Sequence, residues 1–349
     1  MAEDLSSIAG DYLGDILDQP RALEDTFQKL ASSTVLERLA EDLNDGRFHR
    51  LVLTGMGSSF HALHPLNLDL VSHGFTSLMV ETSELVHYRS RFFDPKTLIV
   101  AVSQSGQSAE MIRLIEMNRS GCPVIAVTNT EQSPLAMHAS TALLTYAGTE
   151  FSVSCKTYVT ALVVLKWLAD ILCQRDLRRS RRELKDAAPA AAAYLSEWEN
   201  HVRSLVRQLK DVRHLFLVGR GASLAAVGTG ALIVKEADHV HAEGMSSAAF
   251  RHGPLEMLGN EMFVLVFSGD VKTRALNERL SNDIRQQGGR AELVGENATL
   301  ECFRLADHGS SLRPVLEMLP VQMITLALAL SAGRKPGQFL VATKVTTTE

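Results

Sequence analysis

Three serines crowd a short loop, Ser103-Gln104-Ser105-Gly106-Gln107-Ser108, between an apolar strand-like run and a segment with helical spacing of apolar residues. Backbone N–H groups and the helix dipole converge on an anion at such a junction, and serine hydroxyls add donors. The loop contains no Lys or Arg, so it suits a phosphate monoester better than a magnesium triphosphate, which needs a Gly-Lys-Ser/Thr loop. An ordinary capped turn is the alternative interpretation at this point.

A second small-residue turn, Gly55-Met56-Gly57-Ser58-Ser59, follows the first apolar run. Open parallel sheets bind ligands at the carboxyl ends of their strands, where small residues let a ligand approach the backbone. The turn does not fit a dinucleotide fingerprint, because Phe60 follows Ser59 where a third glycine is needed, and no acidic residue is placed for a ribose. We expect neither NAD nor another cofactor.

Acidic, basic and imidazole side chains gather between residues 235 and 252. They are Lys235, Glu236, His239, His241, Glu243, Arg251 and His252. His239 and His241 alternate as on a strand, and no His-x-x-x-His pair occurs, so the pattern does not indicate a metal site. Two other roles need such groups: a carboxylate that moves a proton between neighbouring carbons, and an imidazole that opens a sugar ring. A structural ion pair and a structural histidine are the alternatives.

The elements that must position these groups occur twice. Residues 49–63 (HRLVLTGMGSSFHAL) align with residues 213–227 (RHLFLVGRGASLAAV), and each copy reads as strand, Gly-x-Gly-x-Ser turn and helix. Further matched pairs are 97–103 with 262–268, and 120–129 with 287–297. The second copy has lost the serines, because its loop reads Ser268-Gly269-Asp270-Val271-Lys272-Thr273. We predict two halves of one architecture, with phosphate held by the first.

Apolar runs of strand length recur through the first half. They are residues 51–53, 78–80, 98–102, 124–127 and 142–144. Near-continuous Val, Ile and Leu runs are typical of strands covered on both faces, so we predict a parallel sheet flanked by helices. The charged, Ala-rich stretch 178–195 is the expected boundary between the halves, and its alanines favour helix over flexible coil.

Length and composition set the class of protein. The 349 residues are about twice the usual domain length, and 46% hydrophobic with 21% charged residues is typical of soluble chains. The net charge of -5 provides no basic field for nucleic acid. Four cysteines without a CxxC pair suggest neither zinc nor disulfides. The N-terminus is acidic and the longest apolar stretch, 321–332, is too short for a bilayer. We expect a soluble, cytoplasmic protein without a membrane partner.

Several motifs in order resemble the double sugar-isomerase (SIS) domain family. They are GMGSSF (55–60), TSEL (82–85), SQSGQSAE (103–110), AGTEFSVSCK (147–156), VKE (234–236), HAE (241–243) and RHGP (251–254). Its best-known member is the isomerase half of glucosamine-6-phosphate synthase, and related members are phosphosugar isomerases, deaminases and deglycases. The resemblance implies an α/β fold of two tandem SIS domains, each a doubly wound α/β/α sandwich with a five-stranded parallel sheet.

The resemblance also implies roles for individual residues. Ser103, Gln104, Ser105 and Ser108 match phosphate-binding positions, Ser59 matches a further sugar contact, and Val153 lies in the segment that lines the sugar. Cys155 replaces the usual threonine of that segment, and we interpret it as a small buried residue rather than a reactive thiol.

The acid–base residues follow from the same resemblance. Glu236 matches the carboxylate that transfers the proton, and His252 matches the imidazole that opens the ring. Lys344 in the ending ATKVT matches an active-site lysine, if a one-residue gap is allowed, and its amine can form a Schiff base or hold a hydroxyl. Relatives bring the RHGP histidine across a dimer interface, so a homodimer with shared sites is expected.

Some positions depart from the synthase pattern. Thr229 and Ile233 replace acidic and basic helix residues, and Ala249 replaces a glutamate. The chain starts MAEDL and reaches the SIS pattern within about fifty residues, so we expect no glutaminase domain and no use of glutamine as nitrogen donor within it.

The expected organisation has four parts: an N-terminal helical segment (1–47), a phosphate-binding SIS domain (48–178), a second SIS domain with the acid–base residues (195–332), and a tail closing the active site (333–349). We predict an enzyme acting on a sugar phosphate or amino-sugar phosphate through an open-chain enediol or enamine. Isomerisation, deamination and cleavage of a fructosamine phosphate all stay open. The alternative is a non-catalytic sugar-phosphate sensor.

Overall fold

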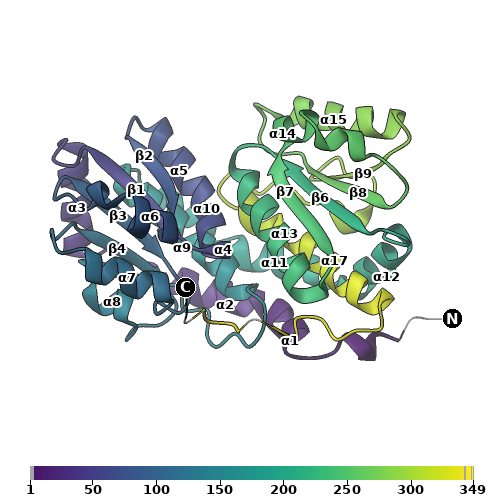
Figure 1. Cartoon of the computed structure of the whole chain (residues 1–349), viewed down its shortest axis with the longest axis horizontal. Coiled ribbons are helices and arrows are strands. Elements are labelled where there is room, and N and C mark those ends of the chain that lie inside the picture. The colour runs from purple at the N-terminus through teal and green to yellow at the C-terminus, as the bar shows by residue number, and fades with distance from the viewer. Residues whose placement is uncertain (1–3, 342, 347, 349) are drawn as a thin grey trace. The chain divides into compact units, whose positions relative to one another are not determined.

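The computed structural model describes residues 4–341, 343–346 and 348, and the chain forms two compact units (Figure 1). Unit 1 contains Met1–Pro20, Glu150–Cys155 and Asp186–Leu340, and unit 2 contains Arg21–Thr149, Lys156–Lys185 and Val341–Glu349. Each unit holds one parallel sheet between helices.

Unit 2 is built on a five-stranded parallel sheet in the order β2-β1-β3-β4-β5. Its strands are β1 (Arg50–Gly55), β2 (Ser77–Glu81), β3 (Thr97–Val102), β4 (Val124–Thr128) and β5 (Thr141–Leu144). Each apolar run predicted as a strand in the first half lies in one of them, so that prediction is confirmed.

Helices cover both faces of this sheet (Figure 1). They are α3 (Thr34–Asn44), α4 (Gly57–His61), α5 (Leu63–Ser72), α6 (Thr82–Tyr88), α7 (Ala109–Met117), α8 (Pro134–His138), α9 (Lys156–Leu172) and α10 (Leu177–Leu184), and α2 (Gln19–Gln28) crosses the unit boundary. Val52, Ile99 and Ala126 form the core of one face with Leu85 of α6 and Met111 of α7. Intervening strand residues point to the other face, because side chains alternate along a strand.

Unit 1 repeats the strand order in a four-stranded parallel sheet, β7-β6-β8-β9. Its strands are β6 (His214–Gly219), β7 (His241–Ser246), β8 (Met262–Phe267) and β9 (Arg290–Val294). Its helices are α1 (Asp11–Leu17), α11 (Ala187–Leu195), α12 (Trp198–Gln208), α13 (Leu224–Asp238), α14 (Ser247–Arg251), α15 (Arg274–Gln286), α16 (Arg313–Leu316) and α17 (Met318–Ser331). The aligned repeats at 49–63 and 213–227 occupy equivalent places, with β1 and β6 at the second position of each sheet.

The prediction of five strands in the second domain was wrong. After β9 the chain makes one isolated bridge, between Gly295 and Arg304, and then a 3-10 turn, η5 (Glu301–Phe303), precedes α16. The segment 304–311 (RLADHGSS) is polar and has no apolar run like the one in β5. A strand needs apolar residues to pack against flanking helices, so this segment stays irregular.

The expected boundary stretch 178–195 is helical, as its alanines predicted. It forms most of α10 and all of α11, with a break at residues 185 and 186. α10 belongs to unit 2 and α11 to unit 1.

One helical segment, Arg313–Ser331, is long and apolar enough to cross a membrane by length and composition. It comprises α16 and α17, and 83% of its most apolar window is buried inside the protein. Val321, Ile324 and Ala327 are fully buried, and α17 packs on α12 and α13. This burial is what a core helix of a soluble protein shows.

A carboxyl group, Glu317, lies inside unit 1 between α16 and α17. It is 1% exposed, and the Ser223 hydroxyl donates to its Oε1 at 2.9 Å, while Oε2 is buried without a hydrogen-bond partner among the described residues. Burial raises the pKa of Glu317 from the ordinary 4.5 to about 7. The native state therefore holds this proton at pH values where the unfolded chain has lost it.

We expect Glu317 to contribute a loss of stability of unit 1 as the pH rises from about 4.5 to about 7, because this side chain keeps its proton in the native state and loses it in the unfolded state in that range. The loss amounts to about 3 kcal/mol at most. The Glu317→Gln variant should remove this pH dependence. Urea unfolding followed by Trp198 fluorescence in a Trp167→Phe background, at pH 5 and pH 8, measures it. The exposed Glu256→Gln variant is the control, and a Glu317→Gln profile parallel to that of the control contradicts the prediction.

Candidate functional site

The serine loop (Ser103–Ser108) continues β3 of unit 2 and leads into the N-terminus of α7. The Ser103 N–H donates to the carbonyl oxygen of Val127 in β4 at 3.0 Å. The first residue of the loop is therefore still hydrogen-bonded to the sheet. The Gly106 N–H donates to Ser103 Oγ (3.1 Å) and the Gln107 N–H to Ser105 Oγ (3.3 Å). Ser108 is the N-cap of α7, and its side chain makes no capping hydrogen bond.

Neighbouring segments hold this loop rigidly. The Gln104 carbonyl accepts from the Asn129 N–H (3.0 Å) and Thr128 Oγ1 (3.2 Å), and the Gly106 carbonyl accepts from the Leu135 N–H (3.0 Å). Gly106 has φ of +64°, and a Cβ there would lie 2.2 Å from Ser133 Oγ, so glycine is required. These contacts fix the three serines at the N-terminus of α7, a place where proteins commonly bind anions.

Ser59 and Lys344 belong to the same unit as the serine loop. Ser59 lies in α4 directly after β1, the strand paired with β3, and a Cβ on Gly55 would lie 3.0 Å from the Val102 carbonyl oxygen. The tail reaches the same end of the sheet, because the Ala109 N–H donates to the Thr346 carbonyl at 3.2 Å. Lys344 is partly buried two residues before that contact.

The equivalent loop of unit 1 already contains an anion. Ser268 pairs with the Val294 carbonyl as Ser103 pairs with Val127, and Gly269 has φ of +70°, like Gly106. Asp270 Oδ1 then accepts from the N–H groups of Lys272 (2.9 Å) and Thr273 (3.3 Å). A carboxylate on these donors repels a phosphate. The copy without the serines therefore also carries a group that opposes phosphate binding, which the sequence comparison did not reveal.

Glu236 lies in the last turn of α13, in unit 1. The next residue of the helix, Ala237, accepts from the Gly337 N–H at 3.1 Å, and the Gly337 carbonyl accepts from Ser152 Oγ at 2.6 Å. Gly337 therefore links the segment of Val153 to the end of α13. A Cβ on Gly337 would lie 2.2 Å from Ser152 Oγ, so only glycine fits there.

Two residues of this segment are fully buried. Val153 and Cys155 are each 0% exposed, which confirms the interpretation of Cys155 as a buried residue. No surface of Val153 is exposed to a ligand in this structure. The four cysteines, Cys122, Cys155, Cys173 and Cys302, are free and buried.

Two buried acids beside Glu236 escaped the sequence reasoning. Tyr12 donates to or accepts from Thr325 Oγ1 at 3.1 Å, and burial raises its pKa well above the ordinary value. Asp238 is 3% exposed, and burial likewise raises its pKa well above the ordinary value. Tyr12 precedes every recognised motif, and Asp238 reads as one more charge in a charged run, so neither gave a signal.

His252 is exposed and follows α14. The sheet of unit 1 separates it from Glu236. Phe250 of α14 packs on Phe216 of β6, whereas a Cβ on Gly230 of α13 would touch Leu217 of β6. Phe216 and Leu217 are neighbours in one strand and point to opposite faces. The structure therefore does not bring Glu236 and His252 together on one face of their unit.

The departures from the synthase pattern are explained in part. Thr229 and Ile233 are each 0% exposed and lie one turn apart on α13, so they pack in the core of unit 1. Ala249 is exposed, and nothing in the structure explains that substitution.

No group of three His, Cys, Asp or Glu side chains that could hold a metal occurs among the residues that the structure describes. His241 lies at the start of β7, where its Nδ1 is 3.3 Å from His214 Nδ1 and its Nε2 is 3.4 Å from Glu243 Oε1.

Comparison with known proteins matches the chain to one family and to relatives with similar names. The profile of the SIS domain matches residues 47–170 and 208–330. Glutamine--fructose-6-phosphate aminotransferase [isomerizing] of Thermococcus kodakarensis is 28% identical over 340 residues, covering 93% of this chain and 56% of that protein. The chain thus spans about half the length of the curated relatives it matches.

Two solved structures share the fold. The C-terminal domain of glucosamine-fructose-6-phosphate aminotransferase from Francisella tularensis superposes with a TM-score of 0.82 at 21% identity, covering 93% of this chain and 96% of that one. Tagatose-6-phosphate ketose/aldose isomerase from Escherichia coli gives 0.79 at 18% identity, covering 98% of each chain.

Proposed function

The chain belongs to the SIS domain family, and on that basis we propose that it is a cytoplasmic enzyme that rearranges a phosphorylated sugar or amino sugar through an open-chain intermediate. The observation that carries the proposal is the serine loop, where the hydroxyl groups of Ser103 and Ser105 are held by N–H groups of the loop and Ser108 is the N-cap of α7, without Lys or Arg in the loop. Such a site favours one phosphate group. The similarity to a sugar-phosphate aminotransferase supports the same substrate class.

In the proposed reaction the serine loop holds the phosphate and the turn with Ser59 contacts the sugar. His252 transfers a proton between the anomeric hydroxyl and the ring oxygen, so that the C1–O5 bond breaks and the free carbonyl forms. Lys344 holds a hydroxyl or forms a Schiff base with that carbonyl. Glu236 then removes the proton from the carbon beside the carbonyl carbon, which gives an enediol or enamine. It returns the proton to the former carbonyl carbon.

Three reactions share these steps: aldose/ketose isomerisation, release of ammonia from an amino-sugar phosphate, and cleavage of a fructosamine phosphate. The experiment that tests the proposal incubates the protein with hexose 6-phosphates, amino-sugar phosphates and fructosamine phosphates, and assays ketose, ammonia and amino acid separately. Turnover of one class supports the enzyme and identifies its reaction. Tight binding of a sugar phosphate without turnover of any class overturns it in favour of the sensor.

We further propose a homodimer whose active sites combine Glu236 of one subunit with His252 of the other. The placement of these residues on opposite faces of one sheet supports it. Closed two-fold pairing is the commonest assembly of soluble proteins.

Co-expression of Glu236→Gln with His252→Asn tests the shared sites. Half of randomly paired dimers are mixed, and each mixed dimer has one of its two sites intact, so activity should recover to about a quarter of the wild-type value. Each variant alone is the control. Sedimentation that shows only monomer at micromolar concentration, or no recovery in the mixture, contradicts the prediction.

A further inference from the structure

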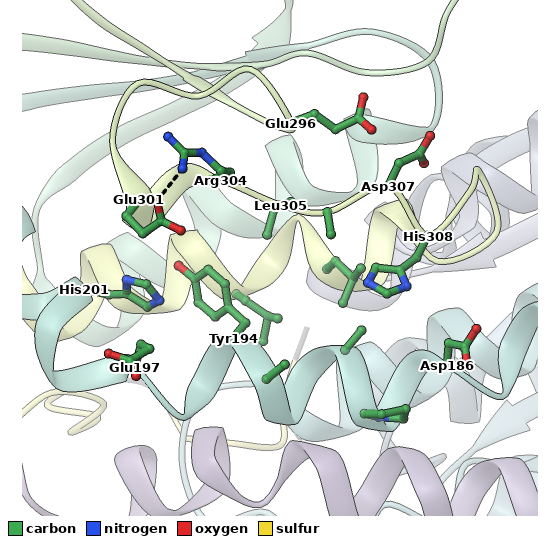
Figure 2. A pocket seen from close by; sticks show the side chains of 16 residues that line it. Asp186, Tyr194, Glu197, His201, Glu296, Glu301, Arg304, Leu305, Asp307 and His308 are labelled. Carbon is green, nitrogen blue, oxygen red and sulfur yellow. Dashed lines mark hydrogen bonds and ion pairs between the residues drawn. The ribbon is translucent and has the colours of Figure 1, made fainter.

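A cleft of about 700 Å³ lies in unit 1, and its lining includes none of the site residues assigned above (Figure 2). It runs between α11 and the segment that follows β9, and we name it the α11 cleft. Its lining residues are Asp186, Pro189, Ala190, Ala193, Tyr194, Glu197, His201, Glu296, Glu301, Arg304, Leu305, Ala306, Asp307, His308, Leu316 and Leu319. Pockets that bind small molecules commonly have volumes of about 300 to 1,000 Å³.

The Ala-rich sequence of α11 explains why this space is empty. Pro189, Ala190 and Ala193 line one wall, and their short side chains leave room between the helix and the facing segment. Leu316 and Leu319 are 4% and 1% exposed and form part of the floor. The cleft therefore offers two apolar walls to the body of a ligand.

One end of the cleft is a rigid aromatic surface. The Tyr194 ring stacks on His201 with 4.5 Å between the centroids and 29° between the planes. The Tyr194 hydroxyl donates to the Cys302 carbonyl at 2.6 Å, which holds the ring in place. His201 is only 6% exposed, and burial lowers its pKa, so the imidazole adds no positive charge at neutral pH.

The charge around the cleft is negative. Five of its lining residues are carboxylates, Asp186, Glu197, Glu296, Glu301 and Asp307, and the one arginine among them is Arg304. Arg304 pairs with Glu301 at 2.6 Å, and Arg274 and Arg313, from outside the lining, pair with Glu296 (3.0 Å) and Asp307 (3.4 Å). Among the carboxylates and arginines alone, five negative charges against three positive charges leave a net charge of -2. A concave site of one sign concentrates ions of the opposite sign.

The carboxylates Glu197 and Glu301 lie on either side of His201, at the aromatic end (Figure 2). Glu197 already accepts from Asn200 Nδ2 (2.7 Å) and Glu301 from Arg304 (2.6 Å). An ammonium group between the two carboxylates would add a further cation beside them, and a cation over an aromatic ring gains cation–π attraction. An aromatic or aliphatic body attached to the ammonium group extends between Ala193 and Leu305.

We propose that the α11 cleft binds a small organic cation, an amine with an apolar or aromatic body, with its ammonium group between Glu197 and Glu301. This site is independent of the proposed reaction, because its lining includes none of the residues assigned to the sugar phosphate.

Calorimetric titration of the full chain with three probes of similar shape tests the ligand class: 2-phenylethylamine, 2-phenylethanol and 3-phenylpropionate. We expect the amine to bind at least about tenfold more tightly than the alcohol, since one hydrogen-bonded charge contributes about 1.5 to 3 kcal/mol. The carboxylate probe should bind most weakly. No binding of the amine, or equal affinities for amine and alcohol, overturns the proposal.

Two variants locate the site. Ala193→Trp fills the cleft from the surface of α11 and should abolish amine binding, whereas Ala192→Trp, at an exposed neighbour outside the lining, should retain it. Glu197→Gln should weaken the amine about tenfold and leave the alcohol unchanged. Equal binding by Ala193→Trp and Ala192→Trp places the amine elsewhere and overturns the assignment. A failure of sugar-phosphate turnover does not bear on this test, because the readout is amine binding.

Discussion

Replacing Glu236 by Gln should lower turnover of a confirmed sugar-phosphate substrate by about 10²- to 10⁴-fold, because a positioned carboxylate that transfers a proton contributes a factor of that size. Substrate affinity should change little, since the amide keeps the shape of the side chain. Single-turnover kinetics give the rate, and calorimetry with the inactive variant gives the affinity. The neighbouring Lys235→Gln, an exposed position on the same turn, is the matched control and should retain turnover.

His252→Asn should behave differently. If the imidazole opens the ring, this variant slows the reaction of the cyclic substrate far more than that of an open-chain analogue, which bypasses the step. Near-normal turnover by Glu236→Gln would show that another group transfers the proton. Glu236 would then be a structural residue at the end of α13.

Replacing Ser103 and Ser105 together by Ala should weaken sugar-phosphate binding by about 10²-fold or more, because hydrogen bonds to a charged group contribute about 1.5 to 3 kcal/mol each. The fold should survive, since the anchors of the loop to Thr128, Asn129 and Leu135 use its backbone carbonyls. Calorimetry with inorganic phosphate and with a hexose 6-phosphate measures the loss.

The duplicated chain supplies its own control for this double variant. Ser268 occupies the place of Ser103 in unit 1, but its loop is occupied by the Asp270 carboxylate. Ser268→Ala should therefore leave phosphate affinity unchanged. Unaltered affinity in the Ser103/Ser105 variant, or a loss in Ser268→Ala, would show that the phosphate binds elsewhere.

Local patterns were sufficient to predict much of the fold. The apolar runs of the first half, the repeat of Gly-x-Gly-x-Ser turns and the alanines of 178–195 predicted strands, two related sheets and helices that the structure contains. These features rest on short-range preferences and on burial of continuous apolar runs, both of which are written in neighbouring residues. The prediction of a fifth strand in the second sheet was wrong because the family resemblance implied it, while its own segment lacked the apolar residues that a strand requires.

The serine loop was predicted in part from the sequence and depends in part on the tertiary structure. Its donors were visible in the residue types, but its rigidity depends on Asn129 and Leu135, which follow the next strand, and on the space that Ser133 leaves for Gly106. Residue types suggested the chemistry, and only the packing of adjacent loops showed how the serine loop is held in place.

Other features depended wholly on the tertiary structure. Glu236 and His252 are only sixteen positions apart in the sequence. Glu236 lies in the helix before β7 and His252 lies after the helix that follows β7, and the two helices pack on opposite faces of the sheet. The α11 cleft likewise combines a helix near residue 190 with a loop near residue 305. Sequence by itself determined which side chains we propose for binding phosphate and for moving protons. Only the fold decided which of them meet, because contacts between distant segments depend on strand order and on which face each helix covers.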